Sequence, residues 1–189
     1  MKDVYEEVPV LQNDRFLLRA ADKKKDAPDL LKVYSDIKAA ELFNSDNCEG
    51  DDFYYTTLER MCQALDFWDF SYKNRYFVRW SVIEKKNNTA IGTIELFNRQ
   101  SQDYFDNCGI LRLDLRSDYE TSENCLSIID LITPKAKDLF SCDMIATKAI
   151  PAAKQRIAAL ISCGFHLSDE KLCGNDMTLY DSYYVKELL

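Results

Sequence analysis

The chain has 189 residues, of which 47% are hydrophobic and 12% aromatic, and this composition excludes a largely disordered polymer. Its formal net charge of −8 argues against nucleic acid as a partner, because neutralising phosphates requires a basic surface. The same charge fits a cationic or amine-bearing ligand somewhat better, although most acidic proteins are simply soluble. We expect a single domain over residues 1–189.

The cysteines and the apolar runs set further limits. The seven cysteines are odd in number and form no CxxC pair, and the chain has a single histidine, so we expect no metal site. Most of the cysteines lie in apolar runs, where a reduced thiol packs as a small hydrophobic group. The N-terminus does not read as a signal peptide, and no apolar run approaches the roughly 18–20 residues that span a bilayer. We therefore expect a reduced, cytoplasmic protein without a membrane partner.

The first third of the chain predicts a strand followed by two helices. Residues 15–20 (RFLLRA) form a short strand-like run. Residues 26–40 place apolar side chains at helical spacing, and Asp26 can cap this helix. Residues 41–52 are polar and predict a loop, whereas residues 56–70 (TTLERMCQALDFWDF) predict a second amphipathic helix.

In the middle of the chain the hydrophobic period changes to that of strands. Residues 74–86 and 90–98 predict two strands joined by the turn at 87–89, which makes an antiparallel hairpin. Residues 109–115 (GILRLDL) predict the next strand. Its leucines alternate with Arg112 and Asp114, a pattern typical of a strand with one buried face.

The last part of the chain predicts alternating helices and strands. A helix is expected from about Glu120, with Pro134 ending or kinking it. Residues 142–150 (CDMIATKAI) predict an apolar strand. A further helix is expected to start at Pro151 and to stop at Gly164. The remaining residues predict a final hairpin, so that the order is β, α, α, β, β, β, α, β, α, β, β.

This order, together with three stretches of sequence, resembles the GNAT superfamily of acyl-CoA N-acyltransferases. Residues 8–36 are similar to the opening of the branch that includes the ribosomal-protein N-terminal acetyltransferases. AIGTIELFN (90–98) resembles the third strand of that branch, and IAALISCGF (157–165) resembles its late helix ending in Gly-Phe. The resemblance implies an α/β (α+β) fold with a mixed, mostly antiparallel central sheet flanked by helices.

The resemblance also implies a cofactor turn after the fourth strand. In this superfamily the turn reads Arg/Gln-x-x-Gly-x-Gly/Ala, and its backbone N–H groups hold the pyrophosphate of acetyl-CoA. Setting Glu123 on a Glu that often follows the motif places Arg116 on its Arg, Tyr119 on its Gly and Thr121 on its Gly/Ala. Both small residues are thus replaced, and glycine matters there because backbone and phosphate must approach closely. The implied cofactor-binding residues are Leu115, Arg116, Ser117, Tyr119, Glu120, Thr121 and Ser122.

The chemistry of the same turn favours an ordinary helix start. Carboxylates in or near the first turn already complement the helix dipole. Ser117 and Glu120 also fit the S-x-x-E capping box, in which side chains bind the N–H groups that a phosphate would need. The sequence leaves both interpretations open, a cofactor turn by position and a capped helix by chemistry. Arg116 is the residue that could favour the first, by pairing with a phosphate directly.

Acyl transfer to an amine needs a base, because the attacking nitrogen must be uncharged. Glu95 and Asp114 are the predicted catalytic candidates, as carboxylates on sheet faces near the expected cleft; the alternative is that both face solvent. The Tyr that family members often carry on the late helix is replaced by Leu160, and the Asn that often starts this helix by Ala153. We expect His166 to be structural rather than catalytic.

Three hypotheses of function follow. The first is an N-acetyltransferase that uses acetyl-CoA as cosubstrate and a small amine or a peptide N-terminus as acceptor. The second is a non-catalytic GNAT-fold binding or regulatory module that has lost acetyl-CoA binding. The third is an enzyme that binds the cofactor in a shifted pose anchored by Arg116. Pairing of two copies into a homodimer is left open.

Overall fold

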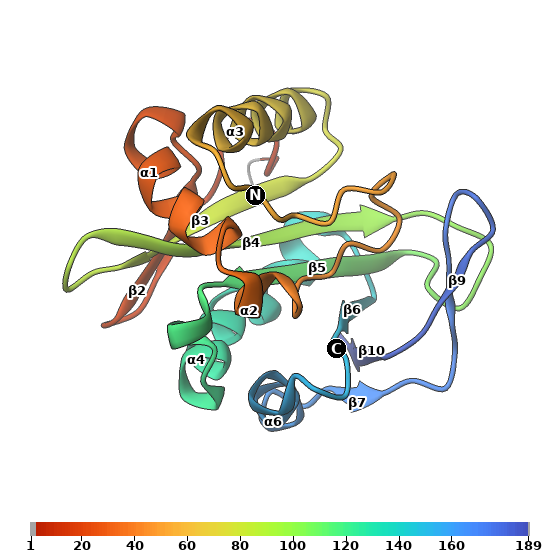
Figure 1. Cartoon of the computed structure of the whole chain (residues 1–189). Helices are drawn as coiled ribbons and strands as arrows, with labels where there is room; N and C mark the ends of the chain where they lie inside the picture. The colour runs from red at the N-terminus through yellow and green to blue at the C-terminus, as the bar shows by residue number, and fades with distance from the viewer. Residues whose placement is uncertain (1–2, 189) are drawn as a thin grey trace.

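The computed structural model describes residues 3–188, and its centre is an eight-stranded sheet (Figure 1). The strand order is β1-β2-β3-β4-β5-β6-β10-β7, and every neighbouring pair is antiparallel except β5 with β6. The strands are β1 (Leu11–Gln12), β2 (Phe16–Ala20), β3 (Val78–Glu84), β4 (Thr89–Arg99), β5 (Cys108–Leu115), β6 (Met144–Lys148), β7 (His166–Leu167) and β10 (Tyr183–Glu187). The predicted mixed, mostly antiparallel sheet flanked by helices is confirmed.

Helices cover both faces of this sheet. They are α1 (Lys23–Tyr34), α2 (Ile37–Ala40), α3 (Leu58–Lys73), α4 (Ser122–Ile132), α5 (Ala136–Phe140) and α6 (Lys154–Ser162). α1 and α3 pack together on one face, whereas α4 and α6 pack together on the other (Figure 1). In the part of the chain that is described, no helix is long and apolar enough to cross a membrane.

The start of α1 differs from the prediction. Its N-cap is Asp22, whose carboxylate accepts hydrogen bonds from the backbone N–H groups of Lys24 and Lys25. Asp26, the predicted cap, is instead buried in the first turn, where it pairs with Arg19 of β2 at 2.6 Å. The hydroxyl of Ser81 in β3 also donates to Asp26, at 2.7 Å. The side chain therefore holds α1 against the sheet, and it also accepts from the N–H of the cap residue Asp22 at 2.8 Å.

The predicted single helix over 26–40 is divided. α1 ends at Tyr34, and Asp36 starts the short helix α2 as its own N-cap. The late helix is also shorter than predicted, because α6 begins at Lys154 and Pro151 lies in the turn before it.

The predicted C-terminal stop of α6 at Gly164 is confirmed. Gly164 has φ +85°, a left-handed conformation that glycine adopts without steric cost. Its N–H donates to the carbonyl of Ile161, and the N–H of Phe165 donates to the carbonyl of Leu160, both at 3.0 Å. These two bonds are those of a Schellman motif, and the burial of Phe165 supplies its hydrophobic contact.

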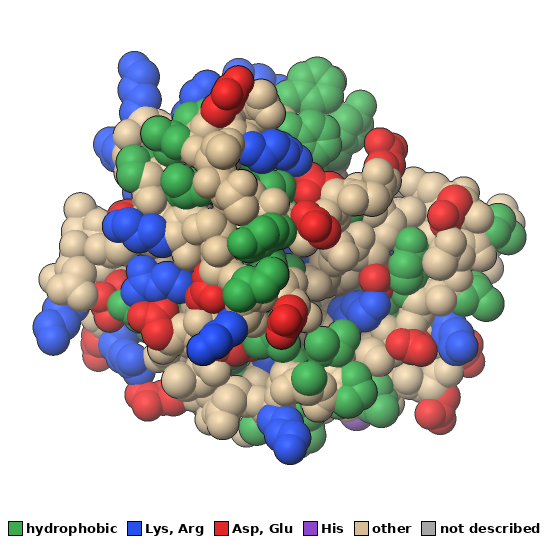
Figure 2. Space-filling model, in the orientation of Figure 1, with side chains coloured by type: hydrophobic (Ala, Val, Ile, Leu, Met, Phe, Trp, Pro, Cys, Tyr) green, Lys and Arg blue, Asp and Glu red, His purple; other side chains and the backbone are tan. Residues whose placement is uncertain are grey.

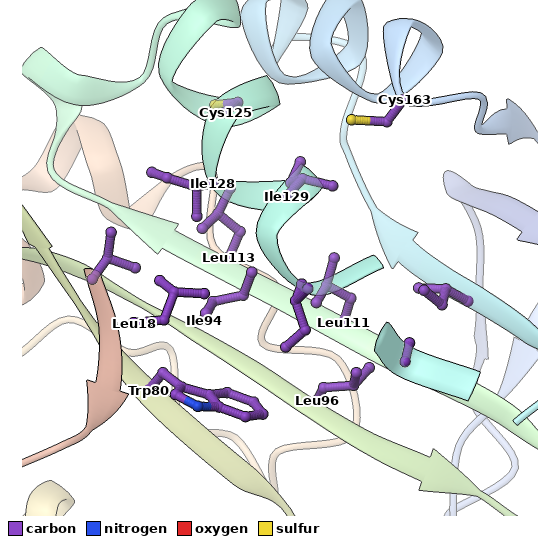
Figure 3. Close-up of a cluster of buried hydrophobic side chains, with 14 of the residues drawn as sticks. Leu18, Trp80, Ile94, Leu96, Leu111, Leu113, Cys125, Ile128, Ile129 and Cys163 are labelled. Carbon is purple, nitrogen blue, oxygen red and sulfur yellow. The ribbon is translucent and has the colours of Figure 1, made fainter. Parts of the chain in front are cut away.

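β5 is buried on both faces, so the prediction of one buried face is wrong. Its leucines pack with Ile128 and Ile129 of α4 and with Ile94 of β4 (Figure 3). Arg112 and Asp114 point to the opposite face, which α1, α3 and the loop between α2 and α3 cover. The charges on this face are therefore enclosed, and each needs a partner inside the protein.

The end of the chain is more divided than a single hairpin. β7 and β10 pair antiparallel, with Tyr184 opposite Leu167. The residues between them form a separate two-stranded sheet of β8 (Leu172–Cys173) and β9 (Leu179–Tyr180), which projects beside the end of β4 (Figure 1).

Gly92 allows β4 and β5 to approach closely, and we predict that Gly92→Ala destabilises the fold. An added Cβ would lie 2.1 Å from the backbone oxygen of Asp114, which can move only if the ladder shifts. The free energy of unfolding, measured with urea, should fall by about 1–3 kcal/mol. Gly109→Ala is the matched control, because its Cβ would meet only side-chain atoms, at 3.0 and 3.3 Å, before any backbone atom. Equal losses in the two variants would contradict the explanation.

Candidate functional site

The candidate site lies where the two parallel strands separate. Paired residues of β5 and β6 run from Cys108 with Met144 to Leu111 with Thr147. β5 then continues to Leu115, still paired with β4 but no longer with β6. Ligands of open α/β sheets commonly bind outside the carboxyl ends of such strands. The turn at 116–121 and the start of α4 lie directly at this opening.

The turn after β5 forms a short 3₁₀ segment and not the predicted capping box. Ser117–Tyr119 makes a single 3₁₀ turn, and α4 begins only at Ser122. Thr121 is the N-cap of α4, and its hydroxyl accepts a hydrogen bond from the N–H of Asn124 at 3.3 Å. The Glu120 side chain points away from the start of α4 and pairs with Arg156 of α6. The predicted S-x-x-E box is therefore wrong, because that carboxylate is needed as a counter-ion.

Backbone N–H groups of the turn donate hydrogen bonds to oxygen atoms of the protein itself. The N–H of Ser117 donates to Oδ2 of Asp36 at 2.9 Å, and that of Ser122 donates to Oε1 of Gln155 at 3.0 Å. The N–H groups of Tyr119, Glu120 and Thr121 donate to carbonyls of the turn itself. A pyrophosphate would need several of these donors. In the conformation described, the turn does not fit a pyrophosphate. Some of these hydrogen bonds would have to break before a pyrophosphate could bind.

Arg116 is also paired. Its guanidinium donates to both carboxylate oxygens of Asp118, at 2.6 and 2.9 Å, and lies 5.1 Å from the ring centroid of Tyr119. The hydrogen bond to Asp118 raises the pKa of Arg116. The pair is on the surface, with a quarter of the arginine side chain exposed, so an anion of higher charge could compete for it.

A buried ion pair joins the turn to α6. Arg156 donates from Nε and Nη2 to the two oxygens of Glu120 at 2.8 and 2.7 Å, and from Nη1 to the carbonyl of Leu42 at 3.2 Å. Only 2% of the arginine side chain and 7% of the glutamate side chain are exposed. Sequence reasoning missed Arg156. A signal was present, since it precedes the buried Leu160 and Cys163 by four and seven residues, on the apolar side of the helix.

Glu95 lies at the centre of a charged row across three strands. The register places Arg79 of β3 opposite Glu95, and Glu95 opposite Arg112 of β5. Glu95 accepts from Nε and Nη2 of Arg79 at 2.9 and 2.7 Å, and from Nη1 of Arg112 at 2.8 Å. It is 1% exposed, so the alternative of a solvent-facing position is wrong. Its use as a base stays a prediction.

Asp114 belongs to the next row of the same sheet face. The hydroxyl of Tyr34 donates to its Oδ2 at 2.8 Å, and Nη1 of Arg79 lies 3.3 Å from the same oxygen. Its Oδ1 is buried and finds no hydrogen-bond partner among the described residues. Burial raises the pKa of Asp114 above its ordinary value, which suits a carboxylate that accepts a proton. Asp114 is 1% exposed, so the alternative of a solvent-facing position is wrong for this residue as well. Its catalytic role stays a prediction.

A cavity of about 690 Å³ opens beside this polar face, between the end of β4 and the β8–β9 sheet. Its walls include Phe97, Ile110 and Arg112 of the central sheet, Tyr183 of β10, and Asp46 of the loop after α2. The charged walls are already paired, since Asp46 binds Nζ of Lys148 at 2.7 Å and Arg112 binds Glu95. Figure 2 shows acidic and basic side chains together in the hollow between this projecting lobe and the rest of the surface.

Comparison with known proteins places this arrangement among the acetyltransferase folds. No family model and no curated protein matches the sequence. A GNAT-family acetyltransferase from Bacillus anthracis is similar in structure, with a TM-score of 0.68, 15% identity, and coverage of 95% of this chain and 98% of that one. This chain has the GNAT fold. The predicted resemblance to the superfamily is thereby confirmed at the level of the fold.

Two further structures that are similar to this chain belong to acetyltransferases with a more specific description. The microcin C7 self-immunity acetyltransferase MccE, solved with acetyl-CoA and AMP, matches with a TM-score of 0.69 and 16% identity over 93% of this chain and 94% of that one. RimL, a ribosomal L7/L12 α-N-protein acetyltransferase solved with coenzyme A, matches with a TM-score of 0.68 and 14% identity over 95% and 98%. The predicted likeness to the ribosomal-protein branch is therefore confirmed for the fold, and it covers nearly the whole chain.

The buried charge row leads to a prediction about stability. Glu95→Gln should lower the free energy of unfolding by about 3–5 kcal/mol, because it leaves two buried arginines without their shared counter-ion. Urea denaturation followed by circular dichroism measures the loss. Glu123→Gln is the control, since this carboxylate is 80% exposed and pairs with Arg15 at the surface; its loss should stay below about 1 kcal/mol. A loss at Glu95 as small as that at Glu123 would contradict the assigned role.

Proposed function

We propose that this chain is an acetyl-CoA-dependent N-acetyltransferase acting on a primary amine, either a small amine or a peptide N-terminus. The observation that carries the proposal is the arrangement around the ends of β5 and β6. The turn that begins α4 follows the carboxyl end of β5, and the 690 Å³ cavity opens beside Ile110 and Arg112, earlier on the same strand, where Arg112 binds the buried Glu95. Solved proteins with this fold include acetyltransferases described with acetyl-CoA or coenzyme A. Glu95, which is separated from the cavity by its partner Arg112, is a carboxylate that would accept a proton from an amine.

The chain's own residues would divide the work as follows. The cavity would hold the acceptor, with Phe97 and Tyr183 contributing apolar surface to its walls. Asp114, with an unpartnered oxygen and a raised pKa, or Glu95 would take up the proton, reached through ordered water. Arg116 is the first residue of the turn and is partly exposed, and we propose that it contacts the cosubstrate's phosphates.

Calorimetric titration of the full chain with acetyl-CoA tests the proposal directly. We expect binding that weakens with salt, because phosphate contacts are electrostatic. We also expect release of free thiol when spermidine, glucosamine or peptides with free N-termini are added. Failure to bind at millimolar acetyl-CoA, with no thiol release, would overturn it.

Arg116→Ala should weaken acetyl-CoA binding about tenfold, the loss expected for a charge-assisted phosphate contact. Arg15→Ala is the matched control, because Arg15 is an exposed arginine that also lies at the start of α4, where it pairs with Glu123. The ratio of the two dissociation constants is the measurement. An unchanged affinity in Arg116→Ala would exclude a pose anchored by this residue.

A second function is favoured by one specific observation. The N–H groups that a pyrophosphate would use are bonded to Asp36, Gln155 and the turn's own carbonyls. This arrangement would suit a non-catalytic GNAT-fold binding or regulatory module that no longer takes acetyl-CoA. The same titration separates the two functions, since the module would neither bind acetyl-CoA nor release thiol.

A further inference from the structure

Residues 36–46, here called the strap, cross the opening at the ends of β5 and β6. The strap consists of α2 and the loop after it, and Figure 1 shows α2 lying across β5 beside the start of α4. α2 contacts β5 directly. The strap therefore covers the place where the candidate site would admit a ligand.

Polar bonds tie the strap to the site at both ends and in the middle. At its start, Oδ2 of Asp36 accepts from the N–H of Ser117 in the turn, at 2.9 Å. In the middle, the carbonyl of Leu42 accepts from Arg156 of α6, at 3.2 Å. At its end, Asp46 accepts from Lys148 at the end of β6, at 2.7 Å, and through its carbonyl from Arg112 of β5, at 2.9 Å. The partners therefore come from the turn, α6, β6 and β5.

Arg156 joins the strap to the turn. Two of its nitrogens bind Glu120 of the turn and the third binds the strap. Carboxylates thus occupy two donors that an anion at this place would use, since Asp36 takes a backbone N–H and Glu120 takes a buried guanidinium. Hydrogen bonds from Ser117 lower the pKa of Asp36 despite its partial burial, so the carboxylate is charged at neutral pH. The tie therefore favours the closed strap across the neutral range.

The strap has two buried apolar side chains, and its buried Asn44 and Asp46 are polar. Ala39 and Phe43 are its buried apolar side chains, whereas Ile37 is 55% exposed and Glu41 faces solvent. α2 has only four residues, too few to be stable alone. Segments with few buried apolar contacts open at a low free-energy cost compared with global unfolding. This is the property expected of a segment that opens while the sheet stays intact.

We propose that the strap is a closing element for the cosubstrate cleft and that Arg156 is its latch. Release of Asp36 and Leu42 frees the Ser117 N–H and one arm of Arg156 for the phosphate groups of an acyl-CoA. The inference rests on the proposed acetyltransferase function. It explains how a turn that is occupied in the closed form can still serve as a phosphate site. Access to the cleft is then set by the difference in free energy between closed and open strap.

Asp36→Ser in the full chain tests the proposal. Serine still caps α2, as Asp36 does through the N–H of Lys38, but is too short to reach Ser117 as well. Asp66→Ser is the control, since Asp66 is an exposed aspartate of α3 that pairs with Lys23 at the first residue of α1, whereas Asp36 follows its last residue. Hydrogen exchange followed by mass spectrometry reports opening of residues 36–46, and calorimetry reports acetyl-CoA affinity. Unchanged exchange in β3, β4 and β5 shows that a variant is folded.

We expect amides of the strap to exchange at least tenfold faster in Asp36→Ser, and acetyl-CoA to bind about five- to tenfold more tightly than to the wild type. Strap exchange that matches the wild type would overturn the role of this tie. If the wild type binds acetyl-CoA and Asp36→Ser binds it equally or less well, the strap does not gate the cleft, while the proposed function stands. If the strap of Asp36→Ser exchanges faster but neither this variant nor the wild type binds acetyl-CoA, the proposed function is overturned. The role of the strap in admitting acetyl-CoA is then overturned with it.

Discussion

A buried charge must find its counter-charge within the protein, and this constraint organises the centre of the molecule. Glu95 lies between Arg79 and Arg112, in register on three adjacent strands, and all three side chains are almost completely enclosed. The Arg79 guanidinium also lies 4.4 Å from the ring centroid of Trp68 on α3, so the helix layer closes over the charges. A slip of one residue between these strands would turn the charges into the leucine core on the other face. The charges therefore specify the register, and the register fixes where β5 ends and the turn begins.

The same constraint acts a second time at the turn. Arg156 is buried on α6 and draws Glu120 out of any capping role, so that the turn is joined to α6 and, through Leu42, to the strap. Asp36 consequently accepts from the Ser117 N–H and Glu120 from the Arg156 guanidinium, which are the donors that we propose for a phosphate. Under the proposed function, these pairs would control whether a ligand enters the site.

The hydrophobic pattern was sufficient for most of the fold. α3, the β3–β4 hairpin, β5 and the glycine stop of α6 lie where the sequence predicts them, because local periodicity and turn chemistry act over a few residues. The missed boundaries involve residues whose partners are distant in the chain. Asp26 could not be recognised as a non-capping residue without Arg19 and Ser81 folded beside it. Pro151 marked the approach to α6 but not its first residue.

The sequence by itself determined the order of the main helices and strands, the likeness to the GNAT fold, and the position of the turn after β5. It also identified Glu95 and Asp114 as carboxylates on sheet faces near the expected cleft. Only the tertiary structure decided that both are buried, that the capping box is not formed, and that Asp36 and Arg156 meet the turn. The physical reason is that burial and ion pairing depend on which distant segments cover a residue. Local pattern fixes the direction of a side chain along its strand or helix, whereas its partner is set by the packing of the whole chain.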